Sequence, residues 1–188
     1  SPCAISLILG LSAVLMALLV GIPLGTLAAL RQNSPTDYSI MGVAVLGIAL
    51  PSFVTGPLFA LVFGLYLRWL PVAGWETGQL RYLVLPVVTL ALPVIAYIAR
   101  LTRGSLLEVL RTNFVRTARA KGLPERVVIR KHALRAGLTP IVTAAGLDLA
   151  GLLGGAIITE AIFSLPGLGA LAISSVVDAD LPLIVGIT

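Results

Sequence analysis

The residues of this chain that could do chemistry are mostly cationic, and they are gathered in one segment. All but three of the 13 Lys and Arg residues lie between Arg100 and Arg135, and this stretch holds two acidic residues, Glu108 and Glu125. Such a segment attracts anionic surfaces and acidic partners. We do not expect it to bind nucleic acid, because it lies between two apolar stretches and contains a single aromatic residue, Phe114.

The sequence lacks the short motifs with which enzymes commonly bind nucleotides or metals. No G-x-x-x-x-G-K-[ST] surrounds Lys121 or Lys131, and no G-x-S-x-G, H-E-x-x-H or C-x-x-C occurs. The single histidine, His132, and the single cysteine, Cys3, have no companion ligands nearby in the sequence. We therefore expect no catalytic residue in this chain, and neither a cofactor nor a metal bound by it.

The composition predicts a helical membrane protein. Of the 188 residues, 58% are apolar and 11% charged, and the mean hydropathy is +1.06. A soluble domain is about half apolar and about a quarter charged. The apolar runs are continuous and do not alternate with polar residues, so they predict an all-α fold and not a β-barrel.

The apolar runs define the expected organisation of the single membrane domain, residues 1–188. At about 20 residues per span, the length allows about four or five spans. We expect them at about 5–30, 38–66, 82–99 and 138–162, with a truncated fifth at 181–188. Because basic loops stay in the cytoplasm, the segments 31–37 and 100–137 are placed there, and 68–81 and 163–180 on the other side. Since the chain starts without Met and stops inside an apolar run, we expect it to be part of a longer protein.

Small residues predict close helix contact and a helix end. Gly21 and Gly25 are four apart on one face of the first span, a spacing that lets another helix approach closely. Residues 106–121 favour helix, Gly122 suits the position after its end, and Pro124 suits the first turn of a second helix.

This basic helix–break–helix segment has two interpretations on physical grounds. It could lie on the membrane surface and bind anionic lipid headgroups. Alternatively, one of its helices could dock into a groove of a cytoplasmic partner. The residues alone leave both open.

The same segment carries a resemblance to a known family. Residues Phe114–Gly122, followed by Ile129 and His132–Arg135, resemble the E-A-A loop of ABC-transporter permeases, in the form found in the dipeptide/oligopeptide/nickel permease family. The resemblance extends in order over essentially the whole chain. Other stretches that match the family are 21–25, 31–34, 51–53, 69–71, 99–103 and 160–169. Within that family the chain looks most like the first of the two permeases of an oligopeptide or dipeptide importer.

The chain departs from the family pattern within the E-A-A motif and at the two ends of the chain. Arg116 stands where the Glu of the E-A-A motif is found, and Thr117 stands in place of its first Ala, whereas Ala118 and Gly122 are retained. Any salt bridge assigned to that Glu is therefore not expected here. Family members also begin with a further span and external segment and end with a complete last span, and we expect this chain to lack both.

The resemblance implies a fold and a set of partners. The fold would be that of a type I ABC importer permease (MetI-like), with about five transmembrane helices and a cytoplasmic coupling helix. The partners would be a second, homologous permease forming a heterodimer, two cytoplasmic ATPase subunits that bind ATP and Mg²⁺, an extracytoplasmic substrate-binding protein, and membrane lipids. The location would be the bacterial cytoplasmic (inner) membrane, crossed several times.

The resemblance also implies which residues meet the ATPases. These residues are Asn113, Phe114, Arg116, Thr117, Ala118, Arg119, Ala120, Lys121, Gly122 and Leu123. Ala118 would pack against the ATPase, with an ordinary helical alanine as the alternative. Arg116, Arg119 and Lys121 would face acidic groups on it, with solvent or lipid as the alternative.

Four further residues are candidates for the pore or its gate. Asp148 lies deep within a span, where an ionisable residue suggests function; it would line the pore or form a hydrogen bond to a neighbouring helix. Glu160 would belong to an outer gate or cap the following turn. Pro51 and Pro93 would kink pore helices.

The predicted function is therefore a permease subunit, not an enzyme, that forms half of a pathway for peptides and couples to ATPases through 113–123. One alternative is the same fold importing nickel or glutathione. Alternatives from other classes are a membrane scaffold with a lipid-binding basic loop, and a secondary carrier.

Overall fold

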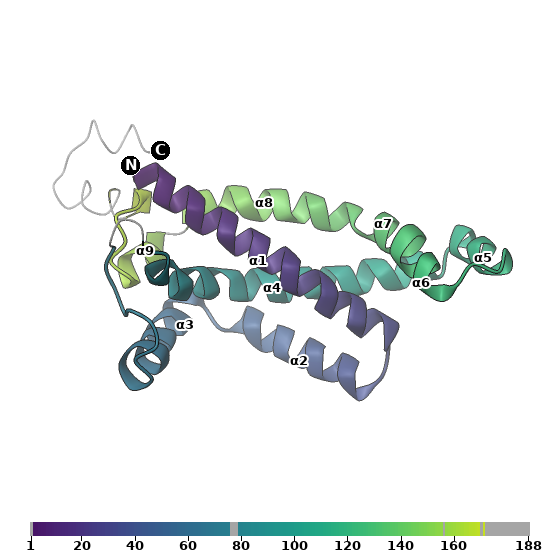
Figure 1. Cartoon of the computed structure of the whole chain (residues 1–188), viewed down its shortest axis with the longest axis horizontal. Helices are drawn as coiled ribbons and strands as arrows, with labels where there is room; N and C mark the ends of the chain where they lie inside the picture. Colours follow the sequence, from purple (N-terminus) through teal and green to yellow (C-terminus); the bar gives the residue numbers. More distant parts are fainter. Residues whose placement is uncertain (1, 76–78, 156, 170, 172–188) are drawn as a thin grey trace. The chain divides into compact units, whose positions relative to one another are not determined.

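The computed structural model describes residues 2–75, 79–155, 157–169 and 171 of the chain. Within these residues the regular structure is helical, with turns between the helices and no strand (Figure 1). The all-α fold predicted from the continuous apolar runs is confirmed.

The chain forms two compact units. Among the described residues, those of unit 1 lie within Ser1–Leu15, Leu50–Leu92 and Leu149–Thr188, and those of unit 2 within Met16–Ala49 and Pro93–Asp148. The helices α1 (Pro2–Leu30), α4 (Arg81–Leu110) and α8 (Thr139–Gly155) each contribute residues to both units.

Two described helices are long and apolar enough to cross a membrane, α1 over Cys3–Leu30 and α4 over its full length. A third crossing is possible if α2 (Pro35–Ala49) and the helical stretch Ser52–Tyr66 together form one broken span. The shorter α8 is apolar over Thr139–Leu152. The predicted span at 181–188 lies outside the described residues.

Two of the predicted spans each contain more than one helix. Residues 38–66 do not form one helix: α2 ends at Ala49, and α3 (Ser52–Phe59) begins after Pro51 and continues as the π-helix η1 (Ala60–Tyr66). Pro51 lacks an N–H and disfavours helical backbone in the residue before it, which explains the break. The predicted segment 138–162 likewise contains α8 and a separate α9 (Ile157–Ile162).

The helix α4 begins in the third predicted span and extends into the basic segment. α4 continues to Leu110, well beyond residue 99, because charged residues such as Arg103 and Glu108 do not interrupt a helix. The helix predicted over 106–121 is instead interrupted at Arg111 and Thr112. A separate helix, α5 (Asn113–Ala120), follows that break.

Close packing of α1 on α4 organises unit 2. A Cβ on Gly21 would lie 2.9 Å from Cγ2 of Ile98, and a Cβ on Gly25 would lie 2.4 Å from the backbone oxygen of Ala99. The predicted close approach at these two glycines is therefore confirmed, with α4 as the partner helix.

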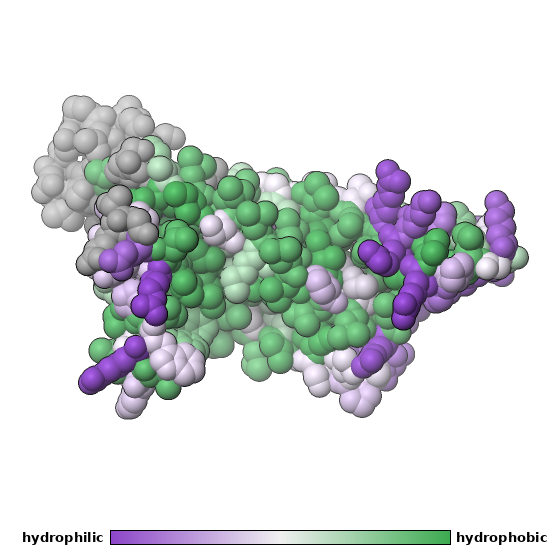
Figure 2. Space-filling view, viewed as in Figure 1, coloured by the Kyte–Doolittle hydropathy of each residue, from purple (hydrophilic) through white to green (hydrophobic). Residues whose placement is uncertain are grey.

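The basic segment of unit 2 folds as short helices. After α5 come α6 (Glu125–Val127), the π-helix η2 (Val128–Ala133) and α7 (Leu134–Gly137). The Ser105 hydroxyl of α4 donates a hydrogen bond to the Gly137 carbonyl at 2.9 Å. Figure 2 shows hydrophilic side chains of unit 2 about α5, α6 and α7 and at the turn between α1 and α2, while its longer helices present mostly hydrophobic ones.

Unit 1 packs α3 against α9. A Cβ on Gly56 of α3 would lie 3.3 Å from Cδ1 of Ile162 of α9. Phe163 and Leu165, which follow α9, are each 1% exposed. The backbone N–H of Gly74 donates to the Phe163 carbonyl at 3.0 Å. These contacts hold the turn after α9 in the core of unit 1.

Candidate functional site

The helix α5 is bounded by Thr112 at its start and by Gly122 after its end. Thr112 precedes it with extended backbone, and Gly122 follows it with a φ of +75°. The N–H of Gly122 donates to the Arg119 carbonyl at 2.9 Å. The predicted helix end at Gly122 is confirmed, since a positive φ at this position favours glycine.

One face of α5 is anchored inside unit 2. Val115 is fully buried and Ala118 is 5% exposed. They belong to an apolar cluster with residues of three other helical elements, α1, α4 and η2. The full set, called here the α5 cluster, is Ala29, Leu106, Val115, Ala118, Val128 and Ala133. Ala118 is small because the chain's own helices pack against it; its contact with an ATPase stays a prediction.

The other face of α5 is exposed. The exposed residues of the proposed coupling set are Asn113, Phe114, Arg116, Thr117, Arg119, Ala120, Lys121, Gly122 and Leu123. The structure therefore brings all of these residues together on one helix and the turn after it. It presents them outward, as a docking element requires.

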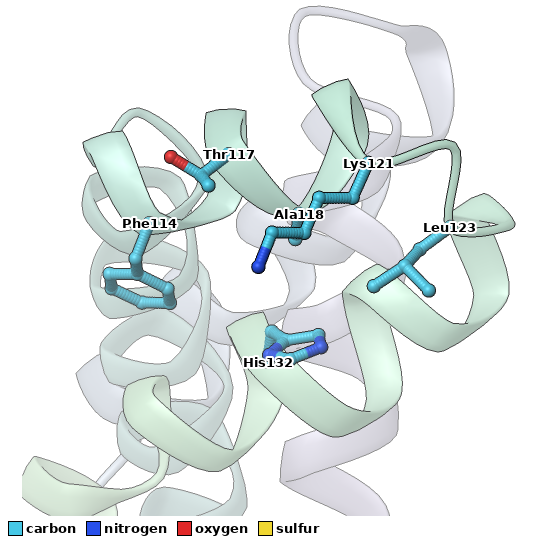
Figure 3. Close-up of a pocket in the computed structure, with 6 residues that line it drawn as sticks. All are labelled: Phe114, Thr117, Ala118, Lys121, Leu123 and His132. Carbon is cyan, nitrogen blue, oxygen red and sulfur yellow. The ribbon is translucent and has the colours of Figure 1, made fainter.

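A cavity of about 350 Å³ opens between α5 and η2. Phe114, Thr117, Ala118, Lys121, Leu123 and His132 line it. Figure 3 shows the Lys121 side chain extending past Ala118 toward His132, with Phe114 and Leu123 to either side. An ammonium group beside an imidazole, with apolar side chains nearby, suits an acidic side chain or another anion.

An ion pair closes the turn after α5. Arg119 donates from Nη2 to Oε1 of Glu125 at 2.6 Å and from Nε to Oε2 at 3.1 Å. The hydrogen bond from Arg119 lowers the pKa of Glu125, and the same bond raises the pKa of Arg119. Arg119 was predicted to face acidic groups on a partner, but its charge is engaged within the chain. Arg116 and Lys121 have no partner among the described residues.

Glu160 caps the turn that follows α9, which was one of its two predicted roles. Its carboxylate, 1% exposed, accepts hydrogen bonds from the N–H of Gly169 at 2.7 Å and from the Ser6 hydroxyl. The Ser6 hydroxyl in turn accepts the N–H of Leu168 at 3.0 Å. Sequence reasoning missed Ser6, since nothing local connects it to a residue 154 positions away. The gate role of Glu160 stays a prediction.

The three other pore candidates, Asp148, Pro93 and Pro51, lie on different helices or at a helix start. Oδ2 of Asp148 is buried and has no hydrogen-bond partner within the described part of the chain, so the predicted bond to a neighbouring helix is not found there. Pro93 lies inside α4, which continues through it. Pro51 caps the start of α3.

In the described residues no group of three or more His, Cys, Asp or Glu could hold a metal ion.

Sequence reasoning also missed a partly buried ion pair in unit 2. Asp37, at the start of α2, is bonded to Arg103 of α4. Both residues lie in segments predicted to face the cytoplasm, and this shared location was the only indication in the sequence that they could meet. Their separation of 66 positions hides the contact from any local pattern.

Comparison with known proteins agrees with the resemblance. The family described as "binding-protein-dependent transport system inner membrane component" matches residues 21–188. The oligopeptide transport system permease protein OppB of Salmonella typhimurium is 46% identical over 180 residues, covering 96% of this chain and 59% of that protein. OppB of Escherichia coli is 44% identical over 188 residues, covering all of this chain and 61% of that protein.

A relative from another bacterium matches to a similar extent. The dipeptide transport system permease protein DppB of Bacillus subtilis is 42% identical over 184 residues, covering 98% of this chain and 59% of that protein. The chain thus spans about three fifths of the length of these relatives. With the family pattern matched from Gly21 to Thr188, the chain belongs to the family of binding-protein-dependent transport system inner membrane components.

Proposed function

We propose that this chain is part of a permease subunit of an ATP-driven importer of oligopeptides or dipeptides in the bacterial cytoplasmic membrane. The relatives that support the substrate class are named as oligopeptide and dipeptide transport permeases. The long apolar helices α1 and α4 suit a place in the membrane. The subunit would form half of the translocation pathway, and a second, homologous permease would form the other half.

The observation that carries the proposal is that α5 has one exposed face and one face packed into unit 2. Its outer face offers Phe114, Arg116 and Lys121, while Val115 and Ala118 are packed into the α5 cluster. Because packed interiors do not deform easily, a push on α5 would displace the helices to which it is anchored. We propose that each permease receives one ATPase in this way and passes its movement to the pathway by alternating access.

Energy and substrate delivery would come from other subunits. Two cytoplasmic ATPases would bind ATP and Mg²⁺, and an extracytoplasmic substrate-binding protein would deliver the peptide. Lipids would surround the apolar helices. The exposed cations of α5–α7 would meet the acidic surface of an ATPase, or anionic lipid if the scaffold alternative holds.

Asp148 is the residue we propose for contact with the peptide. Its buried Oδ2 lacks a partner in the described residues, so a peptide's amino group could supply one. Pro51 and Pro93 would provide points where the pathway helices deform, and Glu160 would hold the turn at a gate.

The test is peptide uptake by the complete complex in proteoliposomes, with the full-length permease, its homologous partner, the ATPases and the binding protein. We expect uptake of a labelled tripeptide to require ATP. Gly122→Pro should abolish copurification of the ATPases and uptake, because proline holds φ near −65°. Gly122→Asn is the matched control, since asparagine tolerates the positive φ.

Three results would redirect the proposal. Failure of the parent permease to retain ATPases would favour a scaffold. Uptake that continues without ATP but stops when the ion gradient is removed would favour a secondary carrier. Uptake of nickel or glutathione in place of peptides would favour another substrate for the same machinery.

A further inference from the structure

A partly buried ion pair joins α2 and α4 of unit 2. Arg103 of α4 donates from Nε to Oδ1 of Asp37 and from Nη2 to Oδ2, each at 2.6 Å. The N–H of Asn33 adds a third hydrogen bond to Oδ2 at 2.9 Å. The Asp37 side chain is 2% exposed and that of Arg103 25%. A two-point contact of this kind allows little rotation of either side chain.

Few side chains of α2 are fully buried. Of its 15 residues, the buried ones are Asp37, Ala44 and Gly47, and Ile40 and Met41 are partly buried. Ala44 and Gly47 offer at most a methyl group to a neighbour, and a Cβ on Gly42 would meet no described atom within 4 Å. Among these contacts of α2, the ion pair is the one with a fixed two-point geometry.

The same part of α4 carries the anchor of α5. Leu106 lies three residues after Arg103, which places both on neighbouring positions of one side of the helix. Leu106 belongs to the α5 cluster with Val115 and Ala118 of α5, and Ala29 near the end of α1 belongs to it as well. A movement of α5 thus meets α4 one helical turn from the ion pair.

We propose that the Asp37–Arg103 ion pair is the positioning contact through which movement of α5 passes from α4 to α2. This inference rests on the proposed function, because it assigns a route to the motion that the ATPases would drive. Without the pair, α2 stays joined to α1 by the turn between them but no longer follows α4. ATP hydrolysis then continues, and fewer peptides cross for each ATP.

A purely stabilising role makes a different prediction. Loss of a merely structural contact reduces the amount of folded complex, so hydrolysis and uptake fall in proportion. A positioning role lowers the ratio of peptide imported to ATP hydrolysed in the complex that does assemble. This ratio is therefore the decisive measurement.

The experiment uses the complete complex in proteoliposomes with a labelled tripeptide. Asp37→Asn, Arg103→Gln and the double variant should each lower the ratio about threefold or more. The ratio in the double variant should equal the ratio in each single variant, because each single variant already lacks the ion pair. Arg100→Gln is the matched control: Arg100 is exposed on α4, has no partner among the described residues, and its loss should leave the ratio unchanged.

An unchanged ratio in the single variants would overturn the inference, and so would additive losses in the double variant or a parallel fall of hydrolysis and uptake. If Asp37→Asn prevents assembly, Arg103→Lys provides the test, because lysine keeps the charge but not the two-point geometry. Arg103→Lys should give a ratio of peptide imported to ATP hydrolysed that lies between the ratios of the parent and of Arg103→Gln. A ratio equal to that of the parent would refute the inference. Absence of ATP-dependent uptake in the parent complex would instead refute the proposed function.

Discussion

The carboxyl group of Glu160 fills the space in which a side chain on Gly167 would lie. A Cβ built on Gly167 would be 2.2 Å from Cδ of Glu160, and one on Gly169 would be 2.4 Å from Cα of Ile157. Neither glycine has a positive φ. The two glycines of this turn are therefore required by the space around a buried carboxylate and not by their backbone conformation.

Gly167→Ala should destabilise the protein by about 1–3 kcal/mol, because the new methyl group displaces the carboxylate from its hydrogen bonds with Ser6 and Gly169. Thermal unfolding of the purified protein in detergent would show a lower midpoint. Gly151→Ala is the control, since a Cβ there meets no described atom within 4 Å. Equal midpoints for the two variants would contradict this account of the turn.

Ser6→Ala should also destabilise the protein, by about 1–3 kcal/mol. The change removes the donor to the buried Glu160 carboxylate and the acceptor of the partly buried Leu168 N–H, so each group loses that partner. Ser39→Ala provides a comparison, because its hydroxyl bonds the Pro35 carbonyl at an exposed site. The same unfolding measurement would refute the prediction if the two serine variants behaved alike.

Gly25→Ala should disrupt the packing of α1 on α4. Its Cβ would lie 2.4 Å from a backbone oxygen, which cannot move aside as a flexible side chain can. We expect a loss of about 1–3 kcal/mol, seen as a lower unfolding midpoint. Gly42→Ala, at a site open in the described structure, should cause no loss and would show whether any glycine replacement is harmful.

The exposed Arg119–Glu125 pair should contribute less than about 1 kcal/mol near neutral pH, because water and salt screen it. Since the pKa of Glu125 is lowered from 4.5 in the folded protein, the contribution is fully present above that value. It is lost as the pH falls through the lowered pKa.

A double-mutant cycle with Arg119→Gln and Glu125→Gln, measured by thermal unfolding at neutral and acid pH, would detect this coupling. Lys121→Gln is a control for removing a nearby positive charge. Coupling that is as strong in acid as at neutral pH would exclude an ionic origin.

Local features of the fold could be predicted because their causes are local. The spacing of Gly21 and Gly25 indicates a close helix contact wherever the partner helix comes from. A glycine after a helical run, as at Gly122, indicates the helix end. The interruption at Arg111 and Thr112 could not be predicted, since the apolar pattern continues across it and packing of Val115 and Ala118 in the α5 cluster decides the break.

The sequence by itself determined the class of the protein. Its low charge and continuous apolar runs require helices in a membrane, and the order of its motifs identifies the permease family. It also determined that the cations are concentrated in one segment, because that is a property of composition along the chain.

Only the tertiary structure decided which of the charges are free. Arg103 is bound to Asp37 and Arg119 to Glu125, whereas Arg116 and Lys121 have no partner among the described residues. It likewise decided that Ser6 supports Glu160. The physical reason is that a hydrogen bond or ion pair depends on the distance between two atoms in space, and for residues far apart in the sequence that distance is set by the packing of whole helices.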